Sequence, residues 1–350
     1  MYKIIKDRKI KIAVVGCGRI SNTHVNAIRN LSESFELVAL CDTNKSNALS
    51  PDLKTGIAFH NDLGVMLQNE ALDVVSLCTP SGIHSVQAIQ VAKYGVDIIT
   101  EKPMATRWQD GIEMVNVCDQ AGVRLFVVKQ NRNNQTLRLL KRAVIDKRFG
   151  KIHMVNVNVF WTRPQEYYDS GTGWRGTWEF DGGAFMNQAS HYVDLLEWLI
   201  GPVEKVQAMM STTRDIETED TGVLNVKWRN GALGSMSVTM LTYPQNLEGS
   251  ITILGERGTA KVGGVAVNQM KVWEFSDVKD YDKEVKKADY VSKSVYGHGH
   301  HTYYEKVIDV LRGNSDPETD GREGLKSLEL LIAAYISARD NKQVGLPLTY

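Results

Sequence analysis

The sequence has no long apolar run and no excess of charge of either sign. Its longest apolar stretches, such as residues 328–336, fall well short of the roughly 20 residues that a membrane-spanning helix needs. The 41 basic and 41 acidic side chains cancel, so the chain as a whole is not drawn to nucleic acid or to an anionic membrane. We therefore expect neither a nucleic-acid partner nor a membrane partner.

Cysteine is scarce as well, and the sequence contains no repeats or proline-rich segments. The four cysteines, at positions 17, 41, 78 and 118, show no metal-binding spacing, and scattered thiols suit a reducing compartment. No apolar segment with a small-residue cleavage site follows the basic residues 1–11. These features predict a cytoplasmic protein whose domains join without a flexible linker.

The first 130 of the 350 residues alternate short apolar runs with amphipathic stretches. This alternation predicts an α/β domain with a parallel sheet and helices on both faces. The expected strands cover residues 11–15, 35–41, 56–59, 73–78, 96–100 and 125–128, and the expected helices cover 22–31, 85–94 and 109–121.

Residues 131–350 follow a different pattern, in which long strands separated by turn signals predominate. We expect a C-terminal α/β domain with a large, mostly antiparallel open sheet, which binds substrate and mediates oligomerisation. The expected strands cover residues 151–160, 203–211, 220–228, 233–240, 247–254, 259–262 and 271–275, and the expected helices 134–146, 184–200, 301–312 and 321–340.

A glycine-rich segment, Gly16–Ser21, lies between the first predicted strand and the first predicted helix. Gly16 permits a tight turn, Gly18 lets a pyrophosphate approach the backbone, and the helix N-terminus supplies free N–H groups. Ser21 stands where the usual fingerprint has a third glycine or an alanine, and it is small enough for the helix to pack on the strand. The segment predicts a dinucleotide site that includes Gly16, Gly18, Arg19 and Ile20.

An acidic residue, Asp42, ends the second predicted strand, 24 residues after Gly18. A carboxylate there accepts the ribose hydroxyls of NAD and repels the 2′-phosphate of NADP. Lys45 is the one nearby cation that would favour NADP, and a turn-capping role is the alternative for Asp42. We expect NAD as the cofactor.

Two further strand ends carry polar side chains, in the segments 79–84 and 101–103. Ligands of parallel sheets bind at the carboxyl ends of the strands, so we expect cofactor contacts there. A lysine at position 102 could stabilise the alkoxide-like form of a substrate hydroxyl, although a surface lysine fits the position equally well. The expected cofactor-binding residues of these segments are Thr79, Pro80, His84, Glu101 and Lys102.

In the second domain, Gly182-Gly183 precedes a predicted helix that bears Asn187, Gln188 and His191. The i, i+4 spacing places Asn187 and His191 on the same helix face. A histidine at this place could act as a general base, because its pKa lies near neutrality. The pattern by itself favours a structural or surface histidine.

Taken together, these motifs resemble the Gfo/Idh/MocA oxidoreductase family over the whole chain. The lysine of Glu-Lys-Pro and the histidine after the glycines are catalytic in that family, which implies catalytic roles for Lys102 and His191. The resemblance also implies that Gln130, Trp174 and Arg175 contact the cofactor. It rests on Gly16–Ser21, Asp42, Thr79–His84, Glu101-Lys102-Pro103 and Gly182-Gly183 with His191.

Three other segments, 161–168, 174–178 and 185–191, are similar to the WlbA/WbpB branch of that family. This branch uses NAD to oxidise the 3-hydroxyl of UDP-N-acetyl-D-glucosaminuronic acid in the synthesis of bacterial surface polysaccharide (O-antigen), and part of it reoxidises NADH with 2-oxoglutarate. The resemblance implies the same UDP-sugar uronate substrate here. It implies substrate-binding roles for Lys102, Arg163, Tyr167, Asn187, Gln188 and His191.

The expected chemistry divides the work between two residues. His191 takes the proton of the sugar hydroxyl and Lys102 stabilises the developing charge; the opposite division stays open. Asn187 stands where many family members carry Asp, so a proton relay through this position is not expected. Arg163 suits a uronate or phosphate group because a guanidinium binds such anions in a bidentate way, while a surface role without a ligand is the alternative for Arg163 and Tyr167.

Three histidines close together, His298, His300 and His301, raise the alternative of a metal site. Such a site needs further ligands, and no carboxylate or thiolate stands nearby at a fixed spacing. We expect no metal, and interpret the segment as a loop on the substrate side.

Two other functions remain open at this point. One is a dehydrogenase of the same family that acts on inositol or another hexose, and UDP binding would separate the two. The other is a non-catalytic sensor of NAD and sugar, which need not keep both Lys102 and His191. One face of the second sheet has no predicted helix to cover it, so we expect an oligomer, and the family implies a homotetramer.

Overall fold

The computed structural model describes residues 2–48, 57–170, 173–291, 297 and 299–349. The chain forms two compact units. The Rossmann unit comprises Met1–Lys129 and His300–Leu328, and the sheet unit comprises Gln130–Gly299 and Glu329–Tyr350. The functional division into domains 1–130 and 131–350 stays a prediction; by packing, residues 300–328 group with the Rossmann unit.

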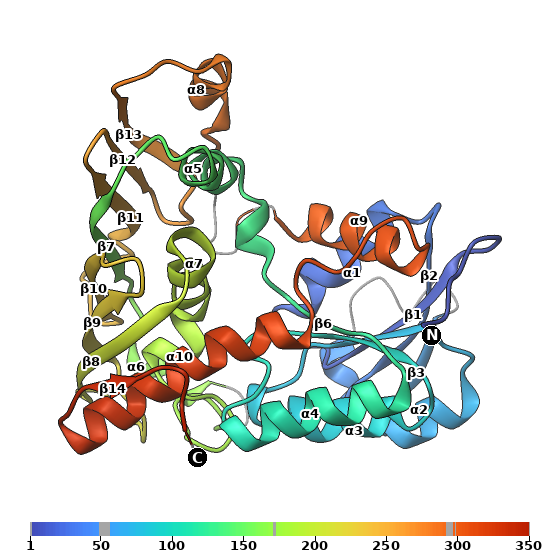
Figure 1. The fold of residues 1–350 in the computed structure, drawn as a ribbon. Helices are drawn as coiled ribbons and strands as arrows, with labels where there is room; N and C mark the ends of the chain where they lie inside the picture. The colour runs from blue at the N-terminus through green and yellow to red at the C-terminus, as the bar shows by residue number, and fades with distance from the viewer. Residues whose placement is uncertain (1, 49–56, 171–172, 292–296, 298, 350) are drawn as a thin grey trace. The chain divides into compact units, whose positions relative to one another are not determined.

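The Rossmann unit is built on six parallel strands in the order β3-β2-β1-β4-β5-β6 (Figure 1). The strand order changes direction between β1 and β4, and open α/β sheets bind ligands at that point. The strands are β1 Ile10–Val15, β2 Phe35–Cys41, β3 Ala58–His60, β4 Val74–Leu77, β5 Asp97–Thr100 and β6 Leu125–Val127. The helices of this part of the chain are α1 Ser21–Asn30, α2 Leu63–Asn69, α3 His84–Ala92 and α4 Trp108–Ala121.

The central strands of this sheet are buried on both faces. All four residues of β4 and all four of β5 are buried, which is why Val74-Val75 and Ile98-Ile99 are adjacent apolar pairs that do not alternate with polar residues. The helix α9, Gly299–Leu311, belongs to the same core, since Tyr304 and Leu311 pack in one cluster with Ile10 and Ile12 of β1. The chain therefore returns to the Rossmann unit after the sheet unit.

The sheet unit contains eight strands in the order β13-β12-β11-β7-β10-β9-β8-β14. Only β7 and β10 pair in parallel among these neighbours, which confirms the mostly antiparallel sheet. The strands are β7 Ile152–Phe160, β8 Val203–Ser211, β9 Thr221–Trp228, β10 Leu233–Thr239, β11 Glu248–Gly255, β12 Gly258–Gly263, β13 Gln269–Phe275 and β14 Val344–Gly345. The helices are α5 Gln135–Ile145, α6 Gln165–Asp169, α7 Ser190–Ile200, α8 Val285–Ala288 and α10 Gly321–Asp340, whose first turns belong to the Rossmann unit.

One face of the large sheet forms the core of this unit. Val155, Val157 and Val159 of β7 are buried at every second position, as expected for a strand with one covered face. Helix α7 packs there: the Tyr192 hydroxyl lies against Gly249 of β11, and the Trp228 indole N–H donates to a carbonyl of α7 at 3.3 Å. Within the described part of the chain, no helix combines the length and the apolar character of a membrane span.

Candidate active site

The turn after β1 has the geometry of a phosphate-binding loop. Gly16 has a φ of +87°, and a Cβ there would lie 2.7 Å from the carbonyl carbon of Cys78, so only glycine fits. A Cβ on Gly18 would meet nothing within 4 Å, which leaves open space above this residue for a ligand. The Ser21 hydroxyl donates to the Gly18 carbonyl at 2.6 Å, so the residue that departs from the usual fingerprint fixes the turn.

The carboxylate of Asp42 braces the same loop. One oxygen accepts the Cys17 N–H at 2.7 Å, and the other accepts the Asn44 N–H at 2.8 Å. The side chain is only partly buried, and its remaining lone pairs are of the type that a ribose hydroxyl needs. Lys45 lies over the Phe59 ring at 5.7 Å. Asp42 thus combines the turn-capping role with a position suited to a ribose.

The loops after β4 and β5 are joined by a buried histidine, His84. Its Nδ1 lies 3.0 Å from the Pro103 carbonyl oxygen and its Nε2 lies 2.9 Å from that of Thr79. Burial lowers the pKa of His84. Because both ring nitrogens contact backbone carbonyls, His84 holds together the two loops that carry Thr79, Pro80 and Lys102.

Lys102 is the second residue after β5 and is half-buried. Its backbone N–H donates to the carboxylate of Glu101 at 3.1 Å. Glu101 is buried, and its other oxygen lies 2.9 Å from Nε2 of His24. Both residues are predicted to contact the cofactor. Their burial differs, because Glu101 is buried and Lys102 is partly exposed.

The segment that leads to His191 is not one regular helix, as the sequence had suggested for residues 184–200. Residues Ala184–Gln188 form a wide π-helical turn, in which the Ala189 N–H reaches the Ala184 carbonyl at 2.8 Å, and α7 begins only at Ser190. Buried Glu219 causes this shape. It accepts the Phe185 N–H at 2.8 Å and occupies the place that a Cβ on Gly183 would take. Such turns are frequent at functional sites.

His191 is buried near the start of α7, and its Nε2 lies 2.9 Å from the amide nitrogen of Gln130. An amide nitrogen donates, so Nε2 acts as the acceptor and the imidazole is neutral. This is the state that a general base needs. Below it, Arg132 holds Asp194 of the same helix in a bidentate contact of 2.7 and 2.8 Å, which fixes α7. Gln130, which the resemblance assigns to the cofactor, thus contacts His191, and its contact with the cofactor stays a prediction.

Asn187 does not stand alone. Its amide donates to one carboxylate oxygen of Asp181, and the other oxygen accepts the Gly176 N–H at 2.8 Å. Asp181 is buried. Many family members carry a carboxylate at position 187 itself. Here the carboxylate belongs to Asp181, which is hydrogen-bonded to Asn187. A search limited to the residue four positions before His191 overlooks it.

Three of the predicted substrate-binding residues lie together in the sheet unit. Arg163 donates from Nε to the Gln188 side chain at 3.1 Å, and Gln188 donates to the Tyr167 hydroxyl at 3.0 Å. The Arg163 guanidinium also lies over the Tyr167 ring at 5.4 Å. These contacts hold Arg163, Tyr167 and Gln188 in one rigid group.

Arg175 also contacts the tyrosine of this group. Its guanidinium lies 5.0 Å from the centre of the Tyr167 ring and 4.9 Å from that of Trp174, and it donates to the Ser170 carbonyl at 2.8 Å. Among the described residues, no carboxylate pairs with Arg163 or Arg175. Whether Trp174 and Arg175 contact the cofactor stays a prediction.

The histidine-rich segment is placed differently from the loop that the sequence suggested. His300 lies in α9, where the fold brings it next to Glu101 and His24 of the Rossmann unit. His301 is exposed and lies 3.5 Å from Glu305, and His298 is outside the described residues. The sequence showed no carboxylate near these histidines, because Glu101 is about 200 residues away along the chain and meets them only through the fold.

Models of known protein families match both parts of the chain. Residues 10–129 match the NAD-binding Rossmann fold of an oxidoreductase family, and residues 141–346 match the C-terminal alpha/beta domain of the same Gfo/Idh/MocA family. The chain belongs to this family. It is therefore an oxidoreductase that uses NAD, as the sequence predicted, and the open space above Gly18 and the carboxylate of Asp42 fit that cofactor.

Comparison with solved structures identifies similar proteins within this family. The WlbA dehydrogenase from Chromobacterium violaceum, in complex with NADH and UDP-GlcNAcA, is 60% identical, with a TM-score of 0.95 over 100% of this chain and 99% of that one. The WlbA dehydrogenase from Bordetella pertussis, with the same two ligands, is 59% identical, with a TM-score of 0.95 over 99% of this chain and 100% of that one. A D-apiose dehydrogenase from Paraburkholderia graminis is 26% identical over 97% of this chain and 90% of its own length. The resemblance to the WlbA branch is thus confirmed.

Proposed function

We propose that this chain oxidises the 3-hydroxyl of UDP-N-acetyl-D-glucosaminuronic acid to the 3-oxo sugar with NAD. The observation that carries the proposal is the 60% identity, over the whole chain, to a WlbA dehydrogenase that binds NADH and UDP-GlcNAcA. The likeness to the same branch further supports a place in the synthesis of a bacterial surface polysaccharide. A cytoplasmic location suits both ligands.

The arginine pair around Tyr167 supports an anionic substrate. A UDP-sugar uronate carries a pyrophosphate and a carboxylate, and guanidinium groups bind both kinds of anion. Arg163 and Arg175 both lie over the Tyr167 ring in the sheet unit, and their charges are not neutralised by a carboxylate among the described residues. A neutral substrate such as inositol has no anionic group that these two arginines could bind.

The proposed chemistry assigns one step to each catalytic residue. His191 accepts the proton of the 3-hydroxyl at Nε2, where its lone pair now meets the amide of Gln130. Lys102 stabilises the negative charge that grows on the same oxygen. NAD, when bound, accepts the hydride from the sugar carbon. Asn187 and Gln188 orient the substrate or the imidazole through the contacts described above.

The direct test is a comparison of three substrates with NAD: UDP-N-acetylglucosaminuronate, UDP-N-acetylglucosamine and myo-inositol. We expect NADH absorbance to appear only with the uronate, because the arginine pair requires the additional carboxylate. A second set of reactions contains 2-oxoglutarate, which we propose as the oxidant of bound NADH; it should increase the yield of 3-oxo sugar. Activity with myo-inositol alone would overturn the substrate assignment, and no activity with any sugar would favour a sensor.

We also propose that the chain assembles into a tetramer through the outer face of the large sheet. Leu254, Met154 and Leu233 lie side by side on β11, β7 and β10, with 39%, 48% and 51% of their surfaces exposed. No helix covers this face among the described residues (Figure 1). Apolar rows of this kind are buried between subunits in oligomers.

A charge placed in this apolar row should disrupt the assembly. We expect Leu233→Glu to lower the molar mass measured by light scattering from that of a tetramer to that of a smaller species, because two carboxylates would be desolvated in a two-fold interface. Val65→Glu is the matched control, since Val65 is 46% exposed on the Rossmann unit. An unchanged mass for Leu233→Glu would exclude this face.

A further inference from the structure

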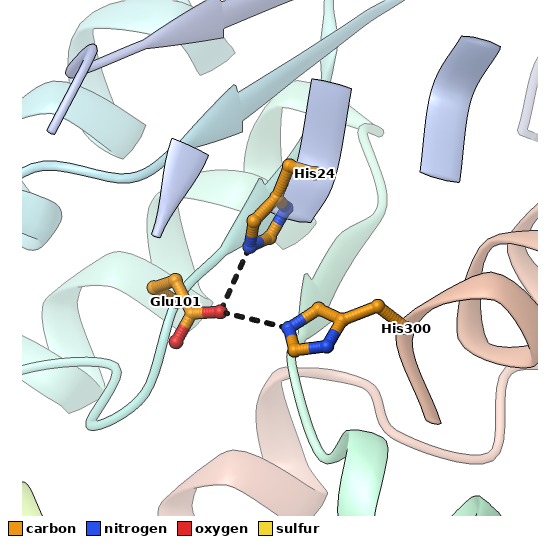
Figure 2. A group of neighbouring side chains, drawn as sticks. All are labelled: His24, Glu101 and His300. Carbon is orange, nitrogen blue, oxygen red and sulfur yellow. Dashed lines mark hydrogen bonds and ion pairs between the residues drawn. The ribbon is translucent and has the colours of Figure 1, made fainter. Parts of the chain in front are cut away.

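Three buried side chains from distant parts of the sequence converge in the Rossmann unit. His24 comes from α1, Glu101 follows β5 and His300 comes from α9; their exposed fractions are 0%, 5% and 2%. In Figure 2 both rings face the same oxygen of the Glu101 carboxylate. That oxygen, Oε1, lies 2.9 Å from Nε2 of His24 and 3.7 Å from Nε2 of His300. Ionisable groups are rarely buried without a role or a partner.

The His24 ring is fixed on its far side as well. Its Nδ1 lies 2.8 Å from the Tyr304 hydroxyl and 3.3 Å from the Ser76 hydroxyl, and these two hydroxyls lie 3.1 Å apart. Burial opposes the charge of His24, but Cys78, Tyr304 and Glu101 outweigh it and raise the pKa well above its ordinary value. Both ring nitrogens of His24 therefore lie at hydrogen-bond distance from an oxygen, as an imidazolium requires.

Glu101 connects His24 to the backbone of Lys102. Burial opposes its charge, yet the contacts from His24 and His300 and the nearby charge of Lys102 hold the pKa of Glu101 well below its usual value. One oxygen accepts from His24, and the other accepts the backbone N–H of Lys102 at 3.1 Å. A fixed negative charge thus lies directly beside the residue that carries the ammonium group.

We propose that the Tyr304–His24–Glu101 chain is the positioning device of Lys102. It fixes the backbone from which the side chain leaves, and it places an ionised carboxylate where it favours the ammonium form. This inference rests on the proposed catalytic role of Lys102. His24, Glu101 and Tyr304 are positioning residues, since they act through Lys102 and not on the substrate.

His300 distinguishes this role from metal binding. Two histidines and a carboxylate are a common metal donor set, and a metal would need all three equally. Here His24 and Glu101 already bond to each other through the two atoms that would bind an ion, whereas Nε2 of His300 lies 3.7 Å from the Glu101 carboxylate, beyond hydrogen-bond distance. Burial lowers the pKa of His300 against the contact with Glu101. Its ring packs edge-on against His24, with 5.2 Å between the ring centres.

The proposal predicts a specific loss in kcat. Glu101→Gln keeps the shape and removes the charge, so we expect kcat to fall about 10- to 100-fold while KM and the NADH dissociation constant change less than about threefold. Tyr304→Phe, which removes only the hydroxyl at the start of the chain, should give a smaller loss of the same kind. His300→Gln should change kcat less than about threefold.

The decisive measurement repeats Glu101→Gln in a Lys102→Ala background. If Glu101 acts only through Lys102, the double variant should be no slower than Lys102→Ala alone, because interactions that serve one step are not additive. A further loss in the double variant would make Glu101 a general structural residue and overturn the proposal. Equal losses for Glu101→Gln and His300→Gln, together with one zinc ion per chain by elemental analysis, would overturn it in favour of a metal site.

A matched pair elsewhere in the Rossmann unit supplies the control. His60 and Glu70 form the same kind of contact at 2.8 Å, at β3 on the edge of the sheet. Glu70→Gln should leave kcat unchanged. The outcome also separates this inference from the proposed function: if Lys102→Ala itself retains activity, the catalytic assignment fails, whereas if only Glu101→Gln retains it, the positioning role alone fails.

Discussion

Replacing Lys102 by alanine, or His191 by asparagine, should lower kcat by about 10²- to 10⁴-fold, the usual contribution of a positioned acid, base or electrostatic group. The Lys102 variant removes the cation that stabilises the developing alkoxide. The His191 variant removes the neutral imidazole whose Nε2 accepts a hydrogen bond from Gln130. Neither change touches the turn at Gly16 and Gly18 that fits the dinucleotide, so the affinity for NADH should change little.

Two substitutions serve as controls for this prediction. Lys93 is an exposed lysine at the end of α3, and His153 is an exposed histidine of β7; Lys93→Ala and His153→Asn should retain full activity. The measurements are steady-state rates with the uronate substrate and NADH fluorescence titrations. A loss of NADH binding in both catalytic variants would show that they are structural residues of the fold and not catalytic ones.

The second large effect concerns stability and its dependence on pH. Glu219 is buried under the turn before His191, and burial raises its pKa from 4.5 to about 7, against the hydrogen bonds from Phe185 and Tyr335. The folded chain therefore binds this proton more tightly than the unfolded chain does. The stabilisation from this group is complete below pH 4.5 and is lost as the pH rises through 7.

Glu219→Gln should remove this dependence, because an amide has the shape of the protonated acid and cannot ionise. A shift of this size corresponds to a difference on the order of 3 kcal/mol in the free energy of unfolding. In equilibrium urea unfolding we expect the variant to be more stable than the wild type at pH 8.5, and the two to be similar at pH 5. Exposed Glu217, whose carboxylate accepts the Trp178 N–H, is the matched control, and its glutamine variant should show no such difference. An equal change at both pH values would contradict the account.

Much of the fold could be predicted because its signals are local. The strand β2 has the bounds that its apolar run indicates, and α10 begins and ends where expected. Gly16 and Gly18 sit in the predicted turn because a positive φ and open space are requirements of single residues. Helix α2 was not predicted, since its seven residues are too few to show a period.

The features of the site that could not be predicted from the sequence depend on contacts between residues far apart in the chain. The turn at 184–188 widens because Glu219, far along the chain, binds the Phe185 N–H, and no local pattern encodes this. The cofactor contact of Glu101 stays a prediction, and only the fold shows that His24 and His300 both face its carboxylate. The carboxylate of Asp181 reaches Asn187 only because the loop closes through Gly176. Local sequence patterns predicted which loops form the site. The hydrogen-bond partners of the side chains in those loops depend on the tertiary structure.

The most direct measurement is to follow the hydrogen at carbon 3 of the sugar. UDP-N-acetylglucosaminuronate deuterated at this carbon is incubated with the enzyme and NAD, and the nicotinamide product is analysed by mass spectrometry. We predict that the deuterium appears in the reduced cofactor and that the reaction is slower than with the unlabelled sugar. Unlabelled NADH from this substrate would contradict the account, since the hydride would then come from another carbon.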